Sequence, residues 1–248
     1  MSRPSPVGPN ALALPIIKKL ANKRVVLASA SPRRKELFAV FDFHPEIVPS
    51  TFAEDLPHAR FAGNLADYPI ATGAEKAMEV YERLVKENER DPPDLVVSAD
   101  TVVVFPPERE TRDGGIHQGE TSEVLEKPIN KHEQARNLAL MAGRNCEVIT
   151  GVSIVYPTIE APGFKVHRSI SCSSLIKFYD NSDEIIKAYV DSEEGIDRAG
   201  GFAIQGLGGI LCEKVDGNYD NCVGFPSAPF WRWMSELDED GVFDEAWS

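Results

Sequence analysis

Four cysteines and five histidines are all that the 248-residue sequence offers for disulfide or zinc chemistry. The cysteines form no CxxC pair, and no histidine stands at a matching spacing, so neither a zinc site nor a disulfide framework is indicated. The histidines are scattered and lack a neighbouring nucleophile, which gives a serine or cysteine hydrolase little support. We expect reduced, core-type cysteines in a cytosolic protein.

Positive charge and long apolar runs are also scarce. The 26 lysines and arginines are outnumbered by 39 aspartates and glutamates, for a net charge of −13, which argues against a nucleic-acid polymer or an anionic membrane as partner. No apolar run is long enough to span a bilayer, and the start of the chain lacks the order of a signal peptide. We therefore expect a cytoplasmic protein that holds any anionic ligand through a local basic cluster.

The apolar residues present predict an α/β fold. A hydrophobic content of 42% suits a real core, in one large domain or two small lobes. The runs "RVVLAS" (24–29) and "LVVSADTVVVF" (95–105) predict buried strands, the second covered on both faces. Apolar residues three and four positions apart in 74–85 predict an amphipathic helix, and Asn181 with Glu184 predicts a further helix start. Because strands and helices interleave, an α/β sheet is the economical architecture.

Two segments stand apart from this pattern. Residues 1–23 predict a proline-rich arm followed by a short helix at "LPIIKKL", before a domain that covers 24–248. Residues 106–123 are polar and rich in glycine, which is typical of a mobile loop or of a hairpin extension. The sequence leaves that choice open.

The stretch "LASASPRRKEL" (27–37) has the parts of an anion site. A strand runs into Ser31 and Pro32, which commonly occupy the cap and the first position of a helix. The unpaired amides and the dipole of such a helix favour an anion, and Arg33 and Arg34 add planar forks that match phosphate oxygens. A capped surface helix with solvated arginines explains the stretch equally well.

A second group of candidates surrounds Asp100, which lies inside the most apolar run of the chain. A carboxylate there needs a metal, a cation or several donors, or else it belongs to a structural ion pair. Lys76 and Lys127 could complete an anion pocket, although each alone is typical of a solvated lysine. Glu54 by itself reads as a surface acid. The glycines of "AGGFAIQGLGG" (199–209) allow close approach to a ligand or merely tight turns.

Six motifs in order resemble the Maf family of nucleoside triphosphate pyrophosphatases. The likeness spans about Arg24 to Pro229. The motifs are "LASASPRRKEL", "EKA" (75–77), "SADTVVVF" (98–105), "EKP" (126–128), "ITGVSIVY" (149–156) and "AGGFAIQGLGG" with "VDGNYDNCVGFP" (199–226). Their order makes the resemblance far more specific than any one motif.

The resemblance implies both a fold and a reaction. The fold is an elongated mixed α/β sheet with flanking helices and two lobes around a central cleft, similar to the inosine triphosphate pyrophosphatases and usually homodimeric. The reaction is hydrolysis of a nucleoside triphosphate between its α- and β-phosphates, giving monophosphate and pyrophosphate. The "ADT" form resembles the branch that prefers dTTP and UTP, whereas the branch that prefers 7-methyl-GTP reads "SDQ".

The resemblance also implies roles for single residues. Asp100 is the catalytic proton acceptor, and Glu54 with Asp100 holds a divalent cation, Mg²⁺ or Mn²⁺. The positions linked to base choice match Arg33, Thr101 and Gln205. The phosphate-facing positions match Ser29, Arg34, Lys76 and Lys127. Cleavage at phosphorus needs neutralised charge, a placed water and a Lewis acid, so these residue types suit it, with Asp100 either orienting the water or deprotonating it.

Three other functions compete with this one. A pyrophosphatase of the 7-methyl-GTP type would use the same residues on another base. A non-catalytic nucleotide-binding regulator of cell division would bind a triphosphate tightly without forming product, and it would have no need of Asp100. A phosphatase that removes the terminal phosphate would release inorganic phosphate instead of pyrophosphate, so the identity of the products separates it from the first reading.

Overall fold

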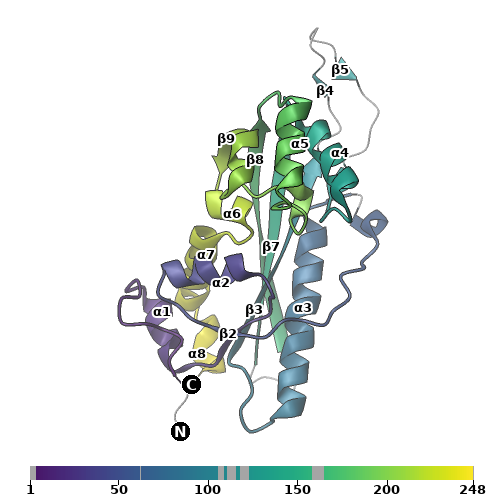
Figure 1. Ribbon diagram of the computed structural model, residues 1–248. Helices are drawn as coiled ribbons and strands as arrows, with labels where there is room; N and C mark the ends of the chain where they lie inside the picture. Colours follow the sequence, from purple (N-terminus) through teal and green to yellow (C-terminus); the bar gives the residue numbers. More distant parts are fainter. Residues whose placement is uncertain are drawn as a thin grey trace. The chain divides into compact units, whose positions relative to one another are not determined.

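The computed structural model describes residues 4–61, 63–105, 109–110, 116–117, 123–157 and 165–247 (Figure 1). The chain divides into two compact units. The first unit comprises Met1–Asp100, Thr150–Ser171 and Gly224–Ser248, and the second comprises Thr101–Ile149 and Cys172–Val223. Each unit has an apolar core of its own.

The helices are distributed over both units. Those of the first unit are α1 (Pro15–Lys19), η1 (Leu20–Asn22), α2 (Pro32–Val40), η2 (His58–Phe61), α3 (Asp67–Glu87), α7 (Ser227–Glu239) and α8 (Val242–Ala246). Those of the second unit are α4 (Lys131–Met141), α5 (Asp183–Asp191), η3 (Ala199–Gly201), η4 (Leu207–Leu211) and α6 (Tyr219–Val223). None of the helices in the described part of the chain combines the length and apolarity that a bilayer crossing needs.

Seven strands form a mixed sheet in the order β2-β1-β3-β7-β8-β9, with β6 also pairing with β3. They are β1 (Val25–Leu27), β2 (Glu46–Ile47), β3 (Leu95–Phe105), β6 (Glu123–Leu125), β7 (Asn145–Pro157), β8 (Lys165–Phe178) and β9 (Cys212–Gly217). Strand β1 runs parallel to β2 and β3, whereas β6 lies antiparallel to β3 and β9 antiparallel to β8. The predicted mixed α/β sheet with flanking helices is confirmed.

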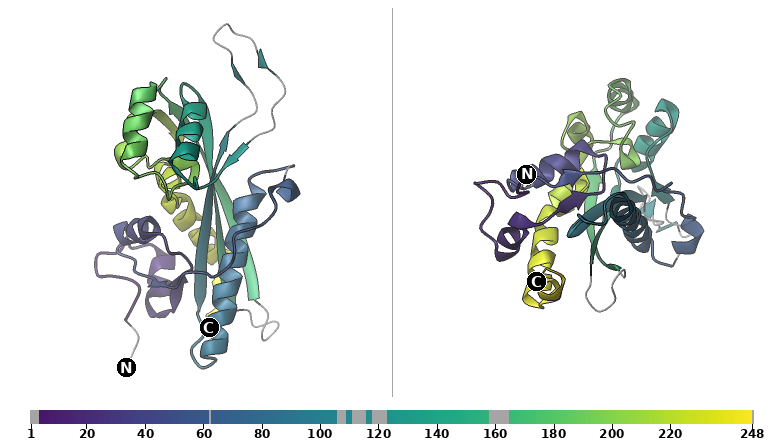
Figure 2. Two further views of the ribbon diagram at one scale, coloured as in Figure 1. Left: turned by 45° about the vertical axis from the view of Figure 1, so that its right-hand side comes forward. Right: turned by 90° about the horizontal axis from the view of Figure 1, so that it is seen from below.

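The strands of the first unit are covered on both faces, as the apolar run 95–105 predicts. Alternate residues of a strand point to opposite faces. Accordingly, Leu95 and Val97 of β3 belong to a core with α1, α2 and α7, whereas Val96 belongs to a second core with α3. Figure 2 shows α3 on one side of these strands and α2 and α7 on the other. The second unit packs α4 and α5 against Val103 and Phe105 of the same strand.

The two segments that stood apart are partly described. The helix predicted after the arm is confirmed as α1, and its Ile16 and Ile17 are fully buried in the first unit. The boundary predicted between residues 23 and 24 stays a prediction. Strands β4 (Arg109–Glu110) and β5 (Ile116–His117) pair antiparallel, which favours a hairpin over a structureless loop. Of 106–123, residues 106–108, 111–115 and 118–122 lie outside the described part of the chain.

One helix start was predicted a residue too early. Helix α5 has Ser182 as its N-cap, whose hydroxyl accepts a hydrogen bond from the Ile185 amide at 3.4 Å. Asn181 instead donates its side-chain amide to the carbonyls of Tyr179 and Leu211, both at 3.0 Å. A long-range partner therefore engages the side chain that the local pattern assigned to the cap.

Candidate active site

Two carboxylates and one lysine form the centre of the candidate site. The Lys76 Nζ atom lies 2.9 Å from Oδ1 of Asp100 and 2.9 Å from Oε2 of Glu54. The side chains of Lys76 and Asp100 are only 7% and 13% exposed, whereas that of Glu54 is 52% exposed. The buried carboxylate thus has a cation as its partner. The structure also brings in Glu54, which lies 22 positions before Lys76 in the chain.

Close packing of α3 on the sheet positions Lys76. A Cβ atom on Gly151 of β7 would come within 2.3 Å of the Ile70 amide nitrogen in α3, so a larger residue there would push the helix away. Ser98, on the strand of Asp100, donates a hydrogen bond to the Gly73 carbonyl of α3. These contacts fix the helix that carries Lys76 against the strand that carries Asp100.

Glu54 is presented on an unusual backbone. Its φ angle is +49°, in the left-handed region that residues other than glycine rarely adopt. Such a conformation costs about 1 kcal/mol or more and persists only where the surroundings impose it. The strained residue itself, Glu54, forms the ion pair with Lys76. We infer that this ion pair helps to hold the backbone of Glu54 in the left-handed region.

Ser29 and Arg34 form a second part of the site. The Ser29 Oγ atom accepts hydrogen bonds from Arg34 Nη1 and from the Ser31 amide, both at 3.2 Å, and Arg34 Nε donates to the Gly224 carbonyl at 2.9 Å. Burial lowers the pKa of the Arg34 guanidinium, while the charges of Asp100 and Glu54 raise it. The guanidinium therefore lies within electrostatic reach of both carboxylates.

Helix α2 begins as the sequence predicts, but its cap differs. Pro32 is its first residue and Ser31 its N-cap, yet the Ser31 side chain makes no capping hydrogen bond. Arg33, in the first turn, has a buried Nη1 atom without a hydrogen-bond partner in the described part of the chain. A buried donor without a partner is costly, and a bound acceptor would satisfy it.

The remaining predicted residues belong to the second unit. Thr101 follows Asp100 on β3 and is half-buried. Lys127 Nζ lies 3.1 Å from Oδ1 of Asp197, and both side chains are exposed. Gln205 is exposed between η3 and η4. The first unit thus holds six of the nine predicted residues, and direct contacts join Lys76 to Glu54 and Asp100 and join Arg34 to Ser29.

Sequence reasoning missed the residues that hold the segment around Gln205. Glu194 accepts hydrogen bonds from the amides of Leu207 and Gly208, both at 3.1 Å. The Tyr189 hydroxyl accepts one from the Ala203 amide at 2.9 Å. An acid beyond the end of a predicted helix carries no pattern that separates it from a solvated surface residue, so only the fold reveals it.

Glu194→Gln is expected to lower the free energy of unfolding by about 1–3 kcal/mol, because hydrogen bonds from backbone amides to a carboxylate are charge-assisted. Urea unfolding at neutral pH measures it. Glu193→Gln is the matched control: it removes the same charge from an exposed pair with Lys131, and exposed ion pairs contribute little to stability. Equal losses in the two variants would contradict the anchoring role of Glu194.

The donor set limits the kind of metal site that this chain can build. In the part of the chain that the structure describes, no three histidine, cysteine, aspartate or glutamate side chains gather as a cation cage. Glu54 and Asp100 supply two carboxylates that both pair with the Lys76 ammonium. Mg²⁺ is commonly held by one or two carboxylates together with water and substrate phosphates. The two side chains fit that mode of binding.

The comparisons agree with the motifs. Residues 24–237 match the family model described as Maf-like protein. The probable bifunctional dTTP/UTP pyrophosphatase/methyltransferase protein of Homo sapiens is 40% identical over 224 residues, which is 90% of this chain and 33% of that protein. The chain therefore spans about a third of the human protein's length.

Two further relatives match over nearly their whole length. The dTTP/UTP pyrophosphatase of Schizosaccharomyces pombe is 36% identical over 92% of this chain and 89% of its own. That of Thermococcus kodakarensis is 35% identical over 87% of this chain and 97% of its own. The Staphylococcus aureus Ham1 protein structure matches with a TM-score of 0.30 and 14% identity over 63% of this chain and 72% of its own, too weak for a comparison of folds. This chain belongs to the Maf family.

Proposed function

We propose that this protein is a nucleoside triphosphate pyrophosphatase that hydrolyses the α–β phosphate bond of UTP and dTTP, releasing the monophosphate and pyrophosphate. The observation that carries the proposal is the pairing of Lys76 with both Asp100 and Glu54, whose charges also act on the Arg34 guanidinium. The names of the relatives, dTTP/UTP pyrophosphatases in a yeast and an archaeon, support the same reaction and the pyrimidine bases.

Basic residues of the site suit the charge of a triphosphate. Lys76 is a cation held in place by its ion pair with Asp100. Arg34 is a second cation, and its Nη1 atom donates a hydrogen bond to the Ser29 hydroxyl. Positioned cations of this kind stabilise the charge that spreads over phosphate oxygens in the transition state. We assign Ser29, Arg34, Lys76 and Lys127 to phosphate binding.

Only one of the two Asp100 carboxylate oxygens accepts a hydrogen bond from the described residues. Its Oδ1 atom accepts from Lys76, and in the described residues its Oδ2 atom accepts no hydrogen bond. The second oxygen is able to orient the attacking water and to accept a proton from it as the new bond to phosphorus forms. We assign Asp100 the catalytic role.

We also propose that Glu54 and Asp100 hold a divalent cation, Mg²⁺ or Mn²⁺. When bound, such a cation supplies Lewis-acid polarisation and neutralises phosphate oxygens. Lys76 now neutralises both carboxylates. The Lys76 ammonium would also serve as a donor to a phosphate oxygen of the bound substrate.

Base choice, assembly and location complete the proposal. We assign Arg33, Thr101 and Gln205 to recognition of the pyrimidine, and the buried Nη1 of Arg33, which has no partner among the described residues, supports a bound acceptor there. We propose a homodimer that acts in the cytoplasm. Light scattering on the purified protein tests the dimer, and a single-chain mass would contradict it.

A nucleotide panel tests the proposed substrate. The kcat/KM values for UTP, dTTP, CTP, GTP and 7-methyl-GTP are measured with Mg²⁺, with the folded state of the protein checked by circular dichroism. UTP and dTTP are expected to rank first. A preference for 7-methyl-GTP would overturn the pyrimidine assignment, and tight binding without turnover would favour a regulator over an enzyme.

A further inference from the structure

One carboxylate outside the six motifs holds the segment that leads to Glu54. Glu79 of α3 accepts hydrogen bonds from Ser50 Oγ at 2.8 Å, from the Thr51 amide at 3.0 Å and from Thr51 Oγ1 at 3.0 Å. Arg83 Nε donates to the same carboxylate at 2.7 Å, and Arg83 Nη2 donates to the Pro49 carbonyl at 2.9 Å. Two side chains one helical turn apart thus fasten residues 49–51 to α3.

The charge on Glu79 is strongly favoured by these donors. Burial raises the pKa of its carboxyl group, but the hydrogen bonds from Arg83, Ser50 and Thr51 outweigh that effect and lower the pKa to about 2. The side chain is 24% exposed. Glu79 therefore keeps its charge to a lower pH than a freely solvated glutamate does, and named donors hold that charge in place.

The Glu79–Thr51 contact joins two segments that each carry a residue of the candidate site. Glu79 follows Lys76 by three positions on α3, so the two side chains lie about one turn apart on the helix. Thr51 precedes Glu54 by three positions. The segment is thus tied to α3 at Thr51, through Glu79, and again at Glu54, through Lys76.

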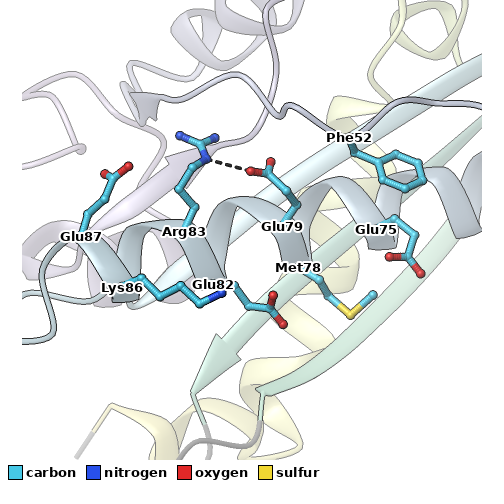
Figure 3. A pocket seen from close by; sticks show the side chains of 8 residues that line it. All are labelled: Phe52, Glu75, Met78, Glu79, Glu82, Arg83, Lys86 and Glu87. Carbon is cyan, nitrogen blue, oxygen red and sulfur yellow. Dashed lines mark hydrogen bonds and ion pairs between the residues drawn. The ribbon is translucent and has the colours of Figure 1, made fainter.

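The short connection between the two ties restricts where Glu54 can lie. Only Phe52 and Ala53 separate them, and the Phe52 amide donates to Ser50 Oγ at 3.0 Å. Figure 3 shows Phe52 at the pocket of about 550 Å³ that α3 lines, with Arg83 and Glu79 joined on the helix. The left-handed φ of +49° at Glu54 completes the turn towards Lys76.

We propose that Glu79 is a positioning residue for Glu54: by holding Ser50 and Thr51 on α3, it places the Glu54 carboxylate against Lys76. The inference rests on the proposed function, because Glu54 is there a holder of the divalent cation. It adds a residue whose hydrogen bonds in the described residues go to Ser50, Thr51 and Arg83 and that acts through the segment it anchors.

The test uses two variants and a matched control in the full chain. Glu79→Ala removes every hydrogen bond, whereas Glu79→Gln keeps one oxygen and the side-chain shape. Glu87→Gln removes the same charge from the exposed end of α3, where Glu87 forms no hydrogen bond in the described residues. Thermal melting and circular dichroism establish that each variant is folded, and Glu79→Gln remains informative if Glu79→Ala is not.

The first readout is hydrogen exchange of residues 50–54, followed by mass spectrometry without nucleotide. Glu79→Ala is expected to speed exchange there, with Glu79→Gln intermediate and Glu87→Gln unchanged. Wild-type exchange in both Glu79 variants would overturn the proposal. This readout does not depend on turnover, so it decides the anchor even if the wild-type protein fails to hydrolyse any nucleotide, which would overturn the proposed function alone.

The second readout is UTP hydrolysis as a function of Mg²⁺ concentration. Glu79→Ala is expected to lower kcat/KM at limiting Mg²⁺ about tenfold, because misplacing a group by a fraction of an ångström has effects of that order. The loss is expected to shrink at saturating Mg²⁺. In a Glu54→Gln background the same substitution is expected to cause no further loss. Losses that multiply in the double variant would show that Glu79 does not act through Glu54.

Discussion

Replacing Asp100 with asparagine is expected to reduce pyrophosphate release from UTP at least about 100-fold, the lower end of what a positioned acid–base group contributes. Asparagine keeps the size of the side chain and an oxygen that accepts the hydrogen bond of Lys76. It loses the negative charge that the proposed roles of Asp100, towards the attacking water and a divalent cation, both require. A continuous assay that detects pyrophosphate measures the change in kcat.

Asp94→Asn is the matched control for that experiment. Asp94 directly precedes β3, and its Oδ2 atom accepts a hydrogen bond from the Arg24 amide at 2.6 Å. Its loss is expected to lower stability by about 1–3 kcal/mol, with kcat nearly unchanged. If Asp100→Asn retained more than a tenth of the wild-type kcat, the catalytic assignment of Asp100 would be wrong.

The second large effect is expected for Lys76→Met, in both stability and activity. Methionine matches the length of the lysine stem, but the 13%-exposed Asp100 side chain loses its ion-pair partner, and so does Glu54. Breaking a buried ion pair from one side is costly, so unfolding is expected to become about 3 kcal/mol easier. UTP turnover is expected to fall by about two orders of magnitude, since phosphate charge is no longer neutralised.

Two further proteins make this second prediction specific. Lys86→Met removes an exposed lysine from the same helix and is expected to change stability by about 0.5 kcal/mol or less. The double variant with Lys76→Met and Asp100→Asn is expected to be more stable than Lys76→Met alone, because the unpaired charge is gone. Urea unfolding of the wild type, the two single variants and the double variant measures these stabilities. A Lys76→Met protein as stable as the wild type would contradict the proposed role of the ion pair.

The strands and the long helix were predictable because their signals are local. The continuous apolar run 95–105 predicts a strand with both faces covered, and β3 has alternate residues in two separate cores. The spacing of apolar residues in 74–85 predicts part of α3, which the structure extends to Asp67–Glu87. Periodicity survives because the same side chains that form the pattern fill the cores.

The site was less predictable, because its contacts join distant parts of the chain. Residue pattern alone read Glu54 as a surface acid, and only the family resemblance gave it a role; the structure pairs it with Lys76. Glu79 was missed, since a glutamate with Arg83 four positions later is typical of a solvated helix pair. Its bonds to Ser50 and Thr51 depend on how the loop crosses α3, which no local pattern encodes.

The central claim is that this constellation cleaves a pyrimidine triphosphate between its α- and β-phosphates. The most direct measurement is to incubate the purified protein with UTP and Mg²⁺ and to separate the products by anion-exchange chromatography. The account predicts UMP and pyrophosphate in equal amounts, with the Asp100→Asn protein nearly inactive. UDP with inorganic phosphate, or no product from protein shown to be folded, would contradict it.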